Sequence, residues 1–270
     1  MRGWIWLGLV AATACGDDGS TIEHHGDDDD DATDRPTTDD TGITTTDPGP
    51  NPTTSGDAET CALLFGGNDR IRGPDEGLPL GTLNRTVQLW VRTTNHHEQV
   101  AFGYGRPSPE QGFMIGTING RPMVRAGSSN AVVVGAGDIA DDAWHHFAAA
   151  YDGRLVVLTV DGDVVGTGEL VTNTIEGDVV AGNTPTGDLS KPWIGWLDDA
   201  KVFYGARAPH DIAEDLDGEL LGPDDLLLWW DFEVPEGTAG PGVTIPDISG
   251  HGHDATTGGS SGTPDFPRCR

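Results

Sequence analysis

Basic residues are scarce in this chain. Its 270 residues include 15 Lys and Arg against 44 Asp and Glu, which gives a formal net charge of −29 at pH 7. A protein that binds nucleic acid uses Lys and Arg to neutralise backbone phosphates, and a chain this acidic repels them. The composition therefore argues against a nucleic-acid partner and makes cations or basic surfaces easier partners.

Long apolar runs are also missing, because no stretch approaches the about 18 apolar residues that a membrane-spanning helix needs. The first fifteen residues, "MRGWIWLGLVAATAC", instead combine Arg2, a short apolar core and small residues, which is typical of a signal peptide. Their end, "AATAC", resembles the lipobox of bacterial lipoproteins, with Ala12 where Leu is usual. The resemblance implies that the chain is exported and that Cys15 is lipidated. The lipid alone would then hold the protein at a bacterial membrane, which we expect to be the outer membrane or the cell surface. The alternative is an ordinary signal peptide cleaved nearby.

Cysteine occurs only three times. If Cys15 carries a lipid, Cys61 and Cys269 remain as a pair in an oxidising compartment. These two flank the folded part of the chain, and the ends of a compact domain often lie close together. We therefore predict a disulfide between Cys61 and Cys269, with two free thiols as the alternative.

Residues 16–60 contain almost nothing that a folded core would bury. The segment is rich in Asp, Thr and Pro, and its high charge and low hydrophobicity do not repay the entropy of ordering. We therefore predict a disordered acidic tether. His24 and His25 lie close to the run Asp27–Asp31, but a flexible chain would lose entropy by gathering metal ligands. A solvated charge run is the better interpretation.

From residue 61 to residue 270 the sequence changes to short apolar runs that turn residues separate. Their spacing of roughly 8 to 14 residues is typical of a two-sheet antiparallel sandwich. The pair Asp161-Gly162 predicts a hairpin turn, and "PHDIAEDLDGELL" is the one stretch with helical character. The predicted strands are "CALLF", "TVQLWV", "QVAFGY", "GFMIGTI", "PMVRAG", "AVVVGAG", "WHHFAAAY", "RLVVLTV", "VVGTGEL", "PWIGWLDDAKVFY" and "LLLWWDF".

The run "WHHFAAAY", residues 144–151, contains two adjacent histidines. Neighbouring side chains of a strand point to opposite faces, so His145 and His146 cannot both reach one metal ion. Both faces of this strand are largely apolar, which predicts an interior strand. We therefore interpret His146 as a hydrogen-bonded core residue and not as a catalytic base.

The same region resembles a known family. "DDAWHHFAAAYDGRLVVLTVDGDVVGTG" is similar to the central hairpin of the laminin-G-like jelly-roll domains in the concanavalin A-like lectin/glucanase superfamily. Four other stretches resemble further parts of that fold, in family order: "CALLFGGNDRI", "TVQLWVRT", "WIGWLDDAKVFYGARAPHDI" and "LLLWWDFEVPEGTAGPGVTIPDISGHGHDAT". The resemblance implies that residues 61–270 form one all-β jelly-roll domain.

The resemblance also implies a structural cation. Asp69 and the adjacent Asp198 and Asp199 lie near the places where relatives hold one, and Ca²⁺ takes about six to eight oxygen ligands. Gly66, however, stands where the family usually has Asp, which weakens a calcium site at that corner. The alternative is that these acids cap turns and face solvent.

The sequence shows no catalytic site. Members of the superfamily that cleave β-glucans place two Glu around an Asp on one strand. The nearest text here is "EDLDGE", in which Asp215 and Asp217 have the wrong offsets from Glu214 and the segment is helical. A Ser nucleophile elbow, a phosphate loop and a Cys/His zinc cluster are also absent from the sequence. We therefore predict a protein that is not an enzyme.

These observations favour a binding or adhesion module at the cell surface, with carbohydrate or a surface protein as its partner. Sugar rings stack on aromatic faces, so the candidate contacts are Trp193, Trp229 and Trp230. Trp229 and Trp230 are neighbours on one predicted strand, so they cannot both face inward. A packing role is the alternative for these tryptophans. For the whole protein, the alternative is a polysaccharide-degrading hydrolase or lyase of the same superfamily.

Overall fold

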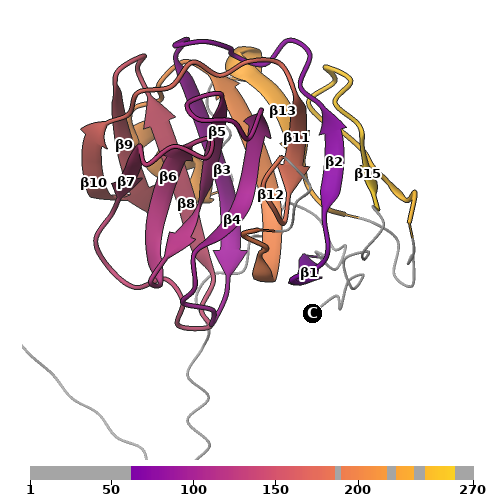
Figure 1. Ribbon diagram of the computed structural model, residues 1–270, viewed down its shortest axis with the longest axis horizontal. Helices are drawn as coiled ribbons and strands as arrows, with labels where there is room; N and C mark the ends of the chain where they lie inside the picture. The colour runs from indigo at the N-terminus through magenta and orange to yellow at the C-terminus, as the bar shows by residue number, and fades with distance from the viewer. Residues whose placement is uncertain (1–61, 186–189, 218–222, 234–240, 259–270) are drawn as a thin grey trace, which may run out of the picture. The chain divides into compact units, whose positions relative to one another are not determined.

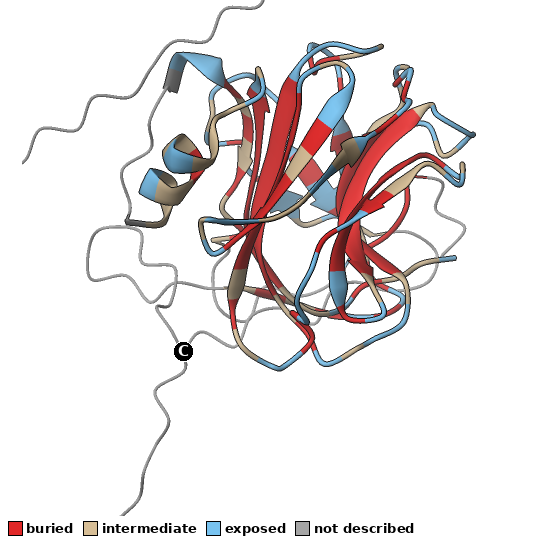
Figure 2. Cartoon of the chain, turned by 90° about the vertical axis from the view of Figure 1, so that its left-hand side faces the viewer, coloured by how far each residue is buried: buried red, intermediate tan, exposed pale blue. Residues whose placement is uncertain are grey.

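The computed structural model describes residues 62–185, 190–217, 223–233 and 241–258. These residues form two antiparallel sheets that pack face to face, as Figures 1 and 2 show, which confirms the predicted all-β sandwich. The tether at residues 16–60 and the three cysteines, Cys15, Cys61 and Cys269, lie outside the described residues.

The first sheet has seven strands. β1 and β13 both pair with the long strand β12, β1 with its first half and β13 with its second half. In spatial order the sheet contains β1 (Leu63–Gly66), β12 (Ile194–Tyr204), β3 (Arg85–Arg92), β8 (His145–Tyr151), β9 (Leu155–Val160) and β10 (Asp163–Glu169), with β13 (Leu226–Trp230) beside β12.

The second sheet has eight strands, of which the longest are the neighbouring strands β4, β5 and β6. Short strands complete it on both sides. In spatial order it contains β14 (Thr244–Ile245), β15 (Ala255–Thr257), β2 (Ile71–Pro74), β11 (Asp178–Ala181), β4 (Gln99–Gly105), β5 (Gly112–Ile118), β6 (Arg121–Ala126) and β7 (Val132–Val134).

Strand β8 shows why its sequence is apolar on both faces. Phe147, Ala149 and Tyr151 point into the main core between the sheets. On the opposite face Ala148 and Ala150 pack against Ile212 of the helix α1 (Pro209–Glu214), which lies outside the first sheet (Figure 2). With β3 and β9 on either side, β8 is the interior strand that the sequence predicts.

Helix α1 has the predicted Pro at its start and is followed by a 3-10 turn at Asp215–Asp217; a second such turn, Pro223–Asp225, precedes β13. In the described part of the chain no helix is long and apolar enough to cross a membrane.

The turn between β9 and β10 lies under α1. There Asp161 and Gly162 both have positive φ, 52° and 84°, and a Cβ on Gly162 would meet the Ala213 Cβ at 3.0 Å.

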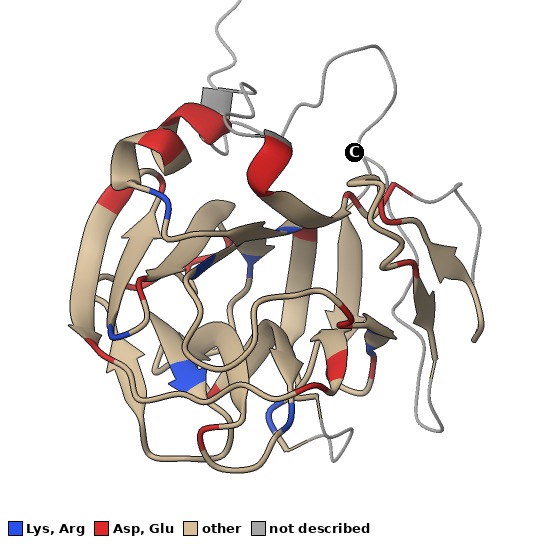
Figure 3. Ribbon diagram, turned by 90° about the horizontal axis from the view of Figure 1, so that it is seen from above, with Lys and Arg blue, Asp and Glu red and all other residues tan. Residues whose placement is uncertain are grey.

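Basic side chains are few among the described elements (Figure 3), and one of them lies in the core. The guanidinium of Arg85, at the start of β3, is fully buried and lies over the rings of Tyr104, Phe113 and Tyr151 at 5.4 to 5.8 Å. Its five N–H groups all donate hydrogen bonds, to Tyr104 Oη, Thr174 Oγ1 and the carbonyl oxygens of residues 80, 81 and 83. Arg85 therefore ties the first sheet to the second sheet and to two loops.

We predict that Arg85→Lys destabilises the domain strongly. An ammonium group has three donors in place of five and no planar surface to lie on three rings. The free energy of unfolding, measured by urea denaturation, should fall by about 3 kcal/mol or more, since hydrogen bonds to a charged group contribute about 1.5 to 3 kcal/mol each. The matched control is Arg154→Lys at an exposed ion pair, which should change it by less than about 0.5 kcal/mol. Equal stability of the two variants would show that the Arg85 contacts are dispensable.

Candidate functional site

Two of the predicted metal ligands lie at a bulge in β12. The pairing of β12 with β3 shifts between Asp198 and Lys201, and Asp199 at this bulge has a positive φ of 51°. The Asp198 carboxylate accepts a hydrogen bond from the Asp199 amide at 2.9 Å. Burial, together with the like charges of Asp199 and Glu233, raises the pKa of Asp198 well above its ordinary value.

Asp69 lies elsewhere. Its carboxylate accepts a hydrogen bond from the Gly66 amide at 2.6 Å and so closes the turn after β1. Gly66 pairs with Ile194, four residues before Asp198 on β12, so Asp69 closes a turn beside the start of that strand while Asp198 lies at the bulge. Within the described residues, no group of three or more His, Cys, Asp and Glu side chains is arranged to hold a metal ion. The carboxylates of Asp69, Asp198 and Asp199 are therefore not gathered into one such cluster of side-chain ligands, and calcium binding stays a prediction.

The predicted ligand-binding tryptophans have different environments. Trp193 and Trp230 have no exposed surface; both belong to the main core, where Trp230 packs against Phe102. Their rings offer no face to a sugar, which removes them from the candidate ligand contacts. As expected for neighbours on one strand, Trp229 points the other way, onto the outer face of the first sheet, and is half-buried.

Trp229 is already engaged by its neighbours. Its Nε1 donates a hydrogen bond to Asp199 Oδ1 at 2.6 Å, and the Lys201 ammonium lies 4.4 Å from its ring centroid. Lys201 Nζ in turn lies 3.5 Å from Asp199 Oδ2. One ring face is therefore covered by a cation, and this Trp–Asp–Lys contact joins β12 to β13.

The two adjacent histidines have opposite surroundings. His145 Nδ1 lies 2.8 Å from Asp161 Oδ2 and its Nε2 lies 3.1 Å from Asp141 Oδ1, and the bond to Asp161 is the largest cause that raises the His145 pKa. His146 is buried edge-on against Trp90, and burial lowers its pKa to about 3. The expectation that His146 is hydrogen-bonded is wrong for Nδ1, which has no partner within the described residues. Because the His146 ring is buried and its pKa is low, it is not placed to act as a catalytic base.

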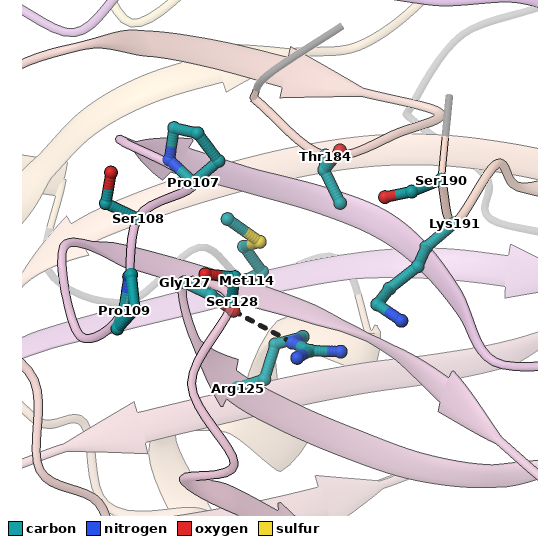
Figure 4. A pocket seen from close by; sticks show the side chains of 10 residues that line it. All are labelled: Pro107, Ser108, Pro109, Met114, Arg125, Gly127, Ser128, Thr184, Ser190 and Lys191. Carbon is teal, nitrogen blue, oxygen red and sulfur yellow. Dashed lines mark hydrogen bonds between the residues drawn. The ribbon is translucent and has the colours of Figure 1, made fainter. Parts of the chain in front are cut away.

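A recess of about 330 Å³ lies at the outer face of the second sheet, and we name it the rim recess (Figure 4). Its floor is Met114, which points away from the main core while its neighbours Phe113 and Ile115 point into it. Three parts of the chain surround it: the β4–β5 turn, the β6–β7 turn and, from the connection between β11 and β12, the described residues Thr184, Ser190 and Lys191. The lining residues are Pro107, Ser108, Pro109, Met114, Arg125, Gly127, Ser128, Thr184, Ser190 and Lys191.

Close packing of two turns shapes this recess. Gly127 has a positive φ of 56°, and a Cβ there would lie 2.0 Å from the Ser108 carbonyl oxygen. Its amide donates a hydrogen bond to the Gly112 carbonyl oxygen at 3.0 Å. Only glycine allows the β6–β7 turn to approach the β4–β5 turn this closely. The two turns therefore hold the recess residues Ser108 and Ser128 in fixed relation.

Two cations in the rim recess share one carboxylate. Arg125 is almost fully buried, and its guanidinium pairs with Glu98 Oε1, while Lys191 Nζ lies 2.9 Å from Glu98 Oε2. Arg125 Nε also donates a hydrogen bond to the Gly127 carbonyl oxygen at 2.9 Å, which Figure 4 shows as a dashed line. These three side chains sum to a charge of +1 in a strongly acidic chain.

The sequence pattern alone does not identify the rim recess. One signal was present: Arg125 interrupts the apolar run "PMVRAG" at a position that alternation places on the outer face. Lys191 is one of only two lysines in the chain. Nothing in the pattern, however, indicates that residues 98, 125 and 191 meet, because Glu98 precedes β4, Arg125 lies in β6 and Lys191 precedes β12, far along the chain.

Comparisons with known proteins agree with this architecture. A family model described as the concanavalin A-like lectin/glucanases superfamily, of the laminin G type, matches residues 65–213. Among solved structures, a Bacteroides ovatus protein whose proposed role is carbohydrate binding has a TM-score of 0.56 at 19% identity, covering 77% of this chain and 61% of its own. Mouse laminin α1 domains LG4-5 give a TM-score of 0.45 at 16% identity, covering 63% of this chain and 48% of their own. No curated protein matches the chain.

We predict opposite pH dependence for the two histidines of β8. A raised folded-state pKa means that His145 stabilises the domain below about pH 6.5 and that this contribution is lost as pH rises through its folded pKa. A lowered pKa means that His146 contributes above about pH 6.5 and that this contribution is lost as pH falls toward 3, by up to about 1.4 kcal/mol per pH unit.

Urea denaturation between pH 4.5 and pH 8.5 checks this prediction. His145→Gln should lower the free energy of unfolding most at acid pH. On acidification, the free energy of unfolding should fall less for His146→Leu than for the unmodified protein. His251→Gln, at an exposed histidine, is the control. Parallel pH profiles for the two β8 variants would contradict the assignment.

Proposed function

Because the chain belongs to the concanavalin A-like lectin/glucanase superfamily, as a laminin G-like domain, we propose that it is a non-catalytic module that binds carbohydrate in the rim recess. The recess supports this proposal, since it combines convergent polar groups with an apolar floor. Its volume is at the small end of ligand sites, which suits one or two sugar rings and not a long chain segment. Likeness to a carbohydrate-binding fold adds support at the level of the fold alone.

The outer rim of the recess carries hydroxyl groups. Ser108 and Ser128 are exposed on the two turns, and Ser190 and Thr184 lie on the opposite side, next to Lys191 (Figure 4). Hydroxyl groups donate and accept hydrogen bonds, as sugar hydroxyls do. Pro107 is half-buried and Pro109 is exposed, and these two rings supply apolar surface against which the carbon face of a sugar ring can pack.

A catalytic alternative depends on Asp198, the described carboxyl with the strongest upward pKa shift. A general acid must reach its substrate, whereas Asp198 is only 4% exposed and accepts a backbone hydrogen bond inside the β12 bulge. The buried environment explains the raised pKa without any substrate. The hydrolase or lyase is therefore the weaker candidate.

The binding proposal predicts that filling the recess removes binding. The measurement is a glycan array with neutral and acidic oligosaccharides from plants and algae. We expect Ser128→Trp, at an exposed turn position, to abolish binding to every oligosaccharide that the unmodified chain binds. Thr244→Trp, on the edge strand β14 of the same sheet, is the matched control and should bind normally. Release of new reducing ends that Asp198→Asn abolishes would establish the catalytic alternative instead.

We further propose that the module is exported and held at a bacterial surface by a lipid on Cys15, with residues 16–60 as a spacer. Repulsion among the Asp residues of that segment would keep it extended and hold the domain away from the membrane. This arrangement would leave the rim recess accessible to polysaccharide outside the cell.

The anchor predicts a change in partitioning. Cys15→Ser should move the protein from the membrane fraction to the soluble fraction and remove incorporation of a labelled fatty acid. Cys61→Ser controls for the loss of a thiol and should leave membrane association unchanged. Membrane association that survives the Cys15 substitution would contradict the lipid anchor.

A further inference from the structure

The cations of the rim recess retain donors that the protein does not use. Arg125 has five N–H groups, and within the described residues three of them are occupied, by Glu98 and by the carbonyl oxygens of Gly127 and Ser129. Lys191 has three, of which one is directed to Glu98. Two donors on each side chain therefore remain for a ligand in the recess.

These donors are held by the fold and do not have to be ordered by a ligand. Arg125 is fixed by two carbonyl oxygens of its own turn and is 7% exposed. Lys191 is positioned by its backbone as well, because its carbonyl oxygen accepts a hydrogen bond from the Val100 amide at 3.0 Å. In Figure 4 both head groups lie on the same side of the recess, with Lys191 directed toward Arg125. Pre-ordered donors reduce the entropy cost of binding.

Among the residues that the structure describes, the lining of the recess contains no aromatic side chain. Stacking on an aromatic face, which contributes much of the affinity for neutral sugars, is therefore not available there. Affinity must come from charge and hydrogen bonds, and the local charge of +1 favours an anion. Charge-assisted hydrogen bonds to a carboxylate or sulfate are about twice as strong as neutral ones.

We propose that the rim recess binds an acidic saccharide, with the carboxylate or sulfate ester of the sugar between Arg125 and Lys191. This inference rests on the proposed function and adds the charge of the ligand. The anion accepts hydrogen bonds from the remaining donors of both cations, while the sugar hydroxyls face Ser108 and Ser128. Glu98 keeps the two cations together and limits their net charge.

The test uses the full chain and three defined probes in isothermal titration calorimetry. The first is a galacturonic acid oligosaccharide, the second is its methyl ester, which has the same rings without the charge, and the third is a sulfated galactan oligosaccharide. We expect the free acid or the sulfated probe to bind and the methyl ester to bind at least about tenfold more weakly. Binding should weaken with added salt, because contacts between charges are screened.

Charge variants test the residues in both directions. Lys191→Gln should weaken binding of the acidic probe about tenfold, and Lys191→Arg should retain it. Glu98→Gln removes the competing carboxylate and should strengthen binding, which simple damage to the fold would not do. Arg154→Gln removes the same charge from an exposed pair on β9 and β10 and is the matched control. Thermal unfolding confirms that each variant is folded.

The outcomes separate this inference from the proposed function. Equal binding of the free acid and its methyl ester, unaffected by Lys191→Gln, would overturn the acidic ligand and leave carbohydrate binding intact. Binding of the sulfated probe alone supports the proposal and identifies sulfate as the anion. If neither these probes nor the neutral oligosaccharides of the array bind, both proposals are wrong.

Discussion

The sandwich depends on how it accommodates one buried guanidinium. A charge between two sheets costs several kcal/mol of desolvation unless its surroundings replace water. Arg85 meets that requirement with five hydrogen bonds and three aromatic rings. Tyr104 extends the network, because its hydroxyl accepts from Arg85 and donates to the Pro79 carbonyl oxygen, and burial raises its pKa to about 12. The acceptors come from strands and loops far apart in sequence, so satisfying Arg85 fixes where the sheets and loops meet.

The small number of basic residues also determines the electrostatics of the domain. Several of the few basic groups are used internally: Arg85 in the core, Lys201 on Trp229, and Arg207 beside Asp215 at 3.0 Å. Asp and Glu outnumber Lys and Arg along the described chain (Figure 3), and the rim recess differs because two cations meet there over one carboxylate. The acidic chain as a whole repels an anion at long range, while the recess attracts it at contact. Physiological salt screens beyond about 8 Å, which weakens the repulsion more than the contact.

The shifted pKa values in this domain are explained by burial and by the strand face on which each group lies, without a catalytic role. Asp198 and His146 both have shifted pKa values because each is enclosed by the sheet and its cover, and neither faces the rim recess. His145, one residue away on the other face, is shifted in the opposite direction by two carboxylates. Shifted pKa values mark catalytic sites only when a substrate can reach them. The residues best placed to meet a ligand here are Arg125 and Lys191, two basic side chains that line the rim recess.

Local pattern determined much of this protein, and tertiary contacts determined the site. The strands β3, β8 and β9, the Asp161-Gly162 turn and the start of α1 follow from alternation and turn chemistry, which act between neighbours in sequence. The short strands β2, β11, β14 and β15 were not predicted, because two to four residues show no period and form only against partners supplied by the fold. Sequence indicated that Trp229 and Trp230 face opposite ways, but the packing of the sheets decided which one is buried. The rim recess exists only because the order of strands in the second sheet brings Glu98, Arg125 and Lys191 together, and no local pattern contains that order.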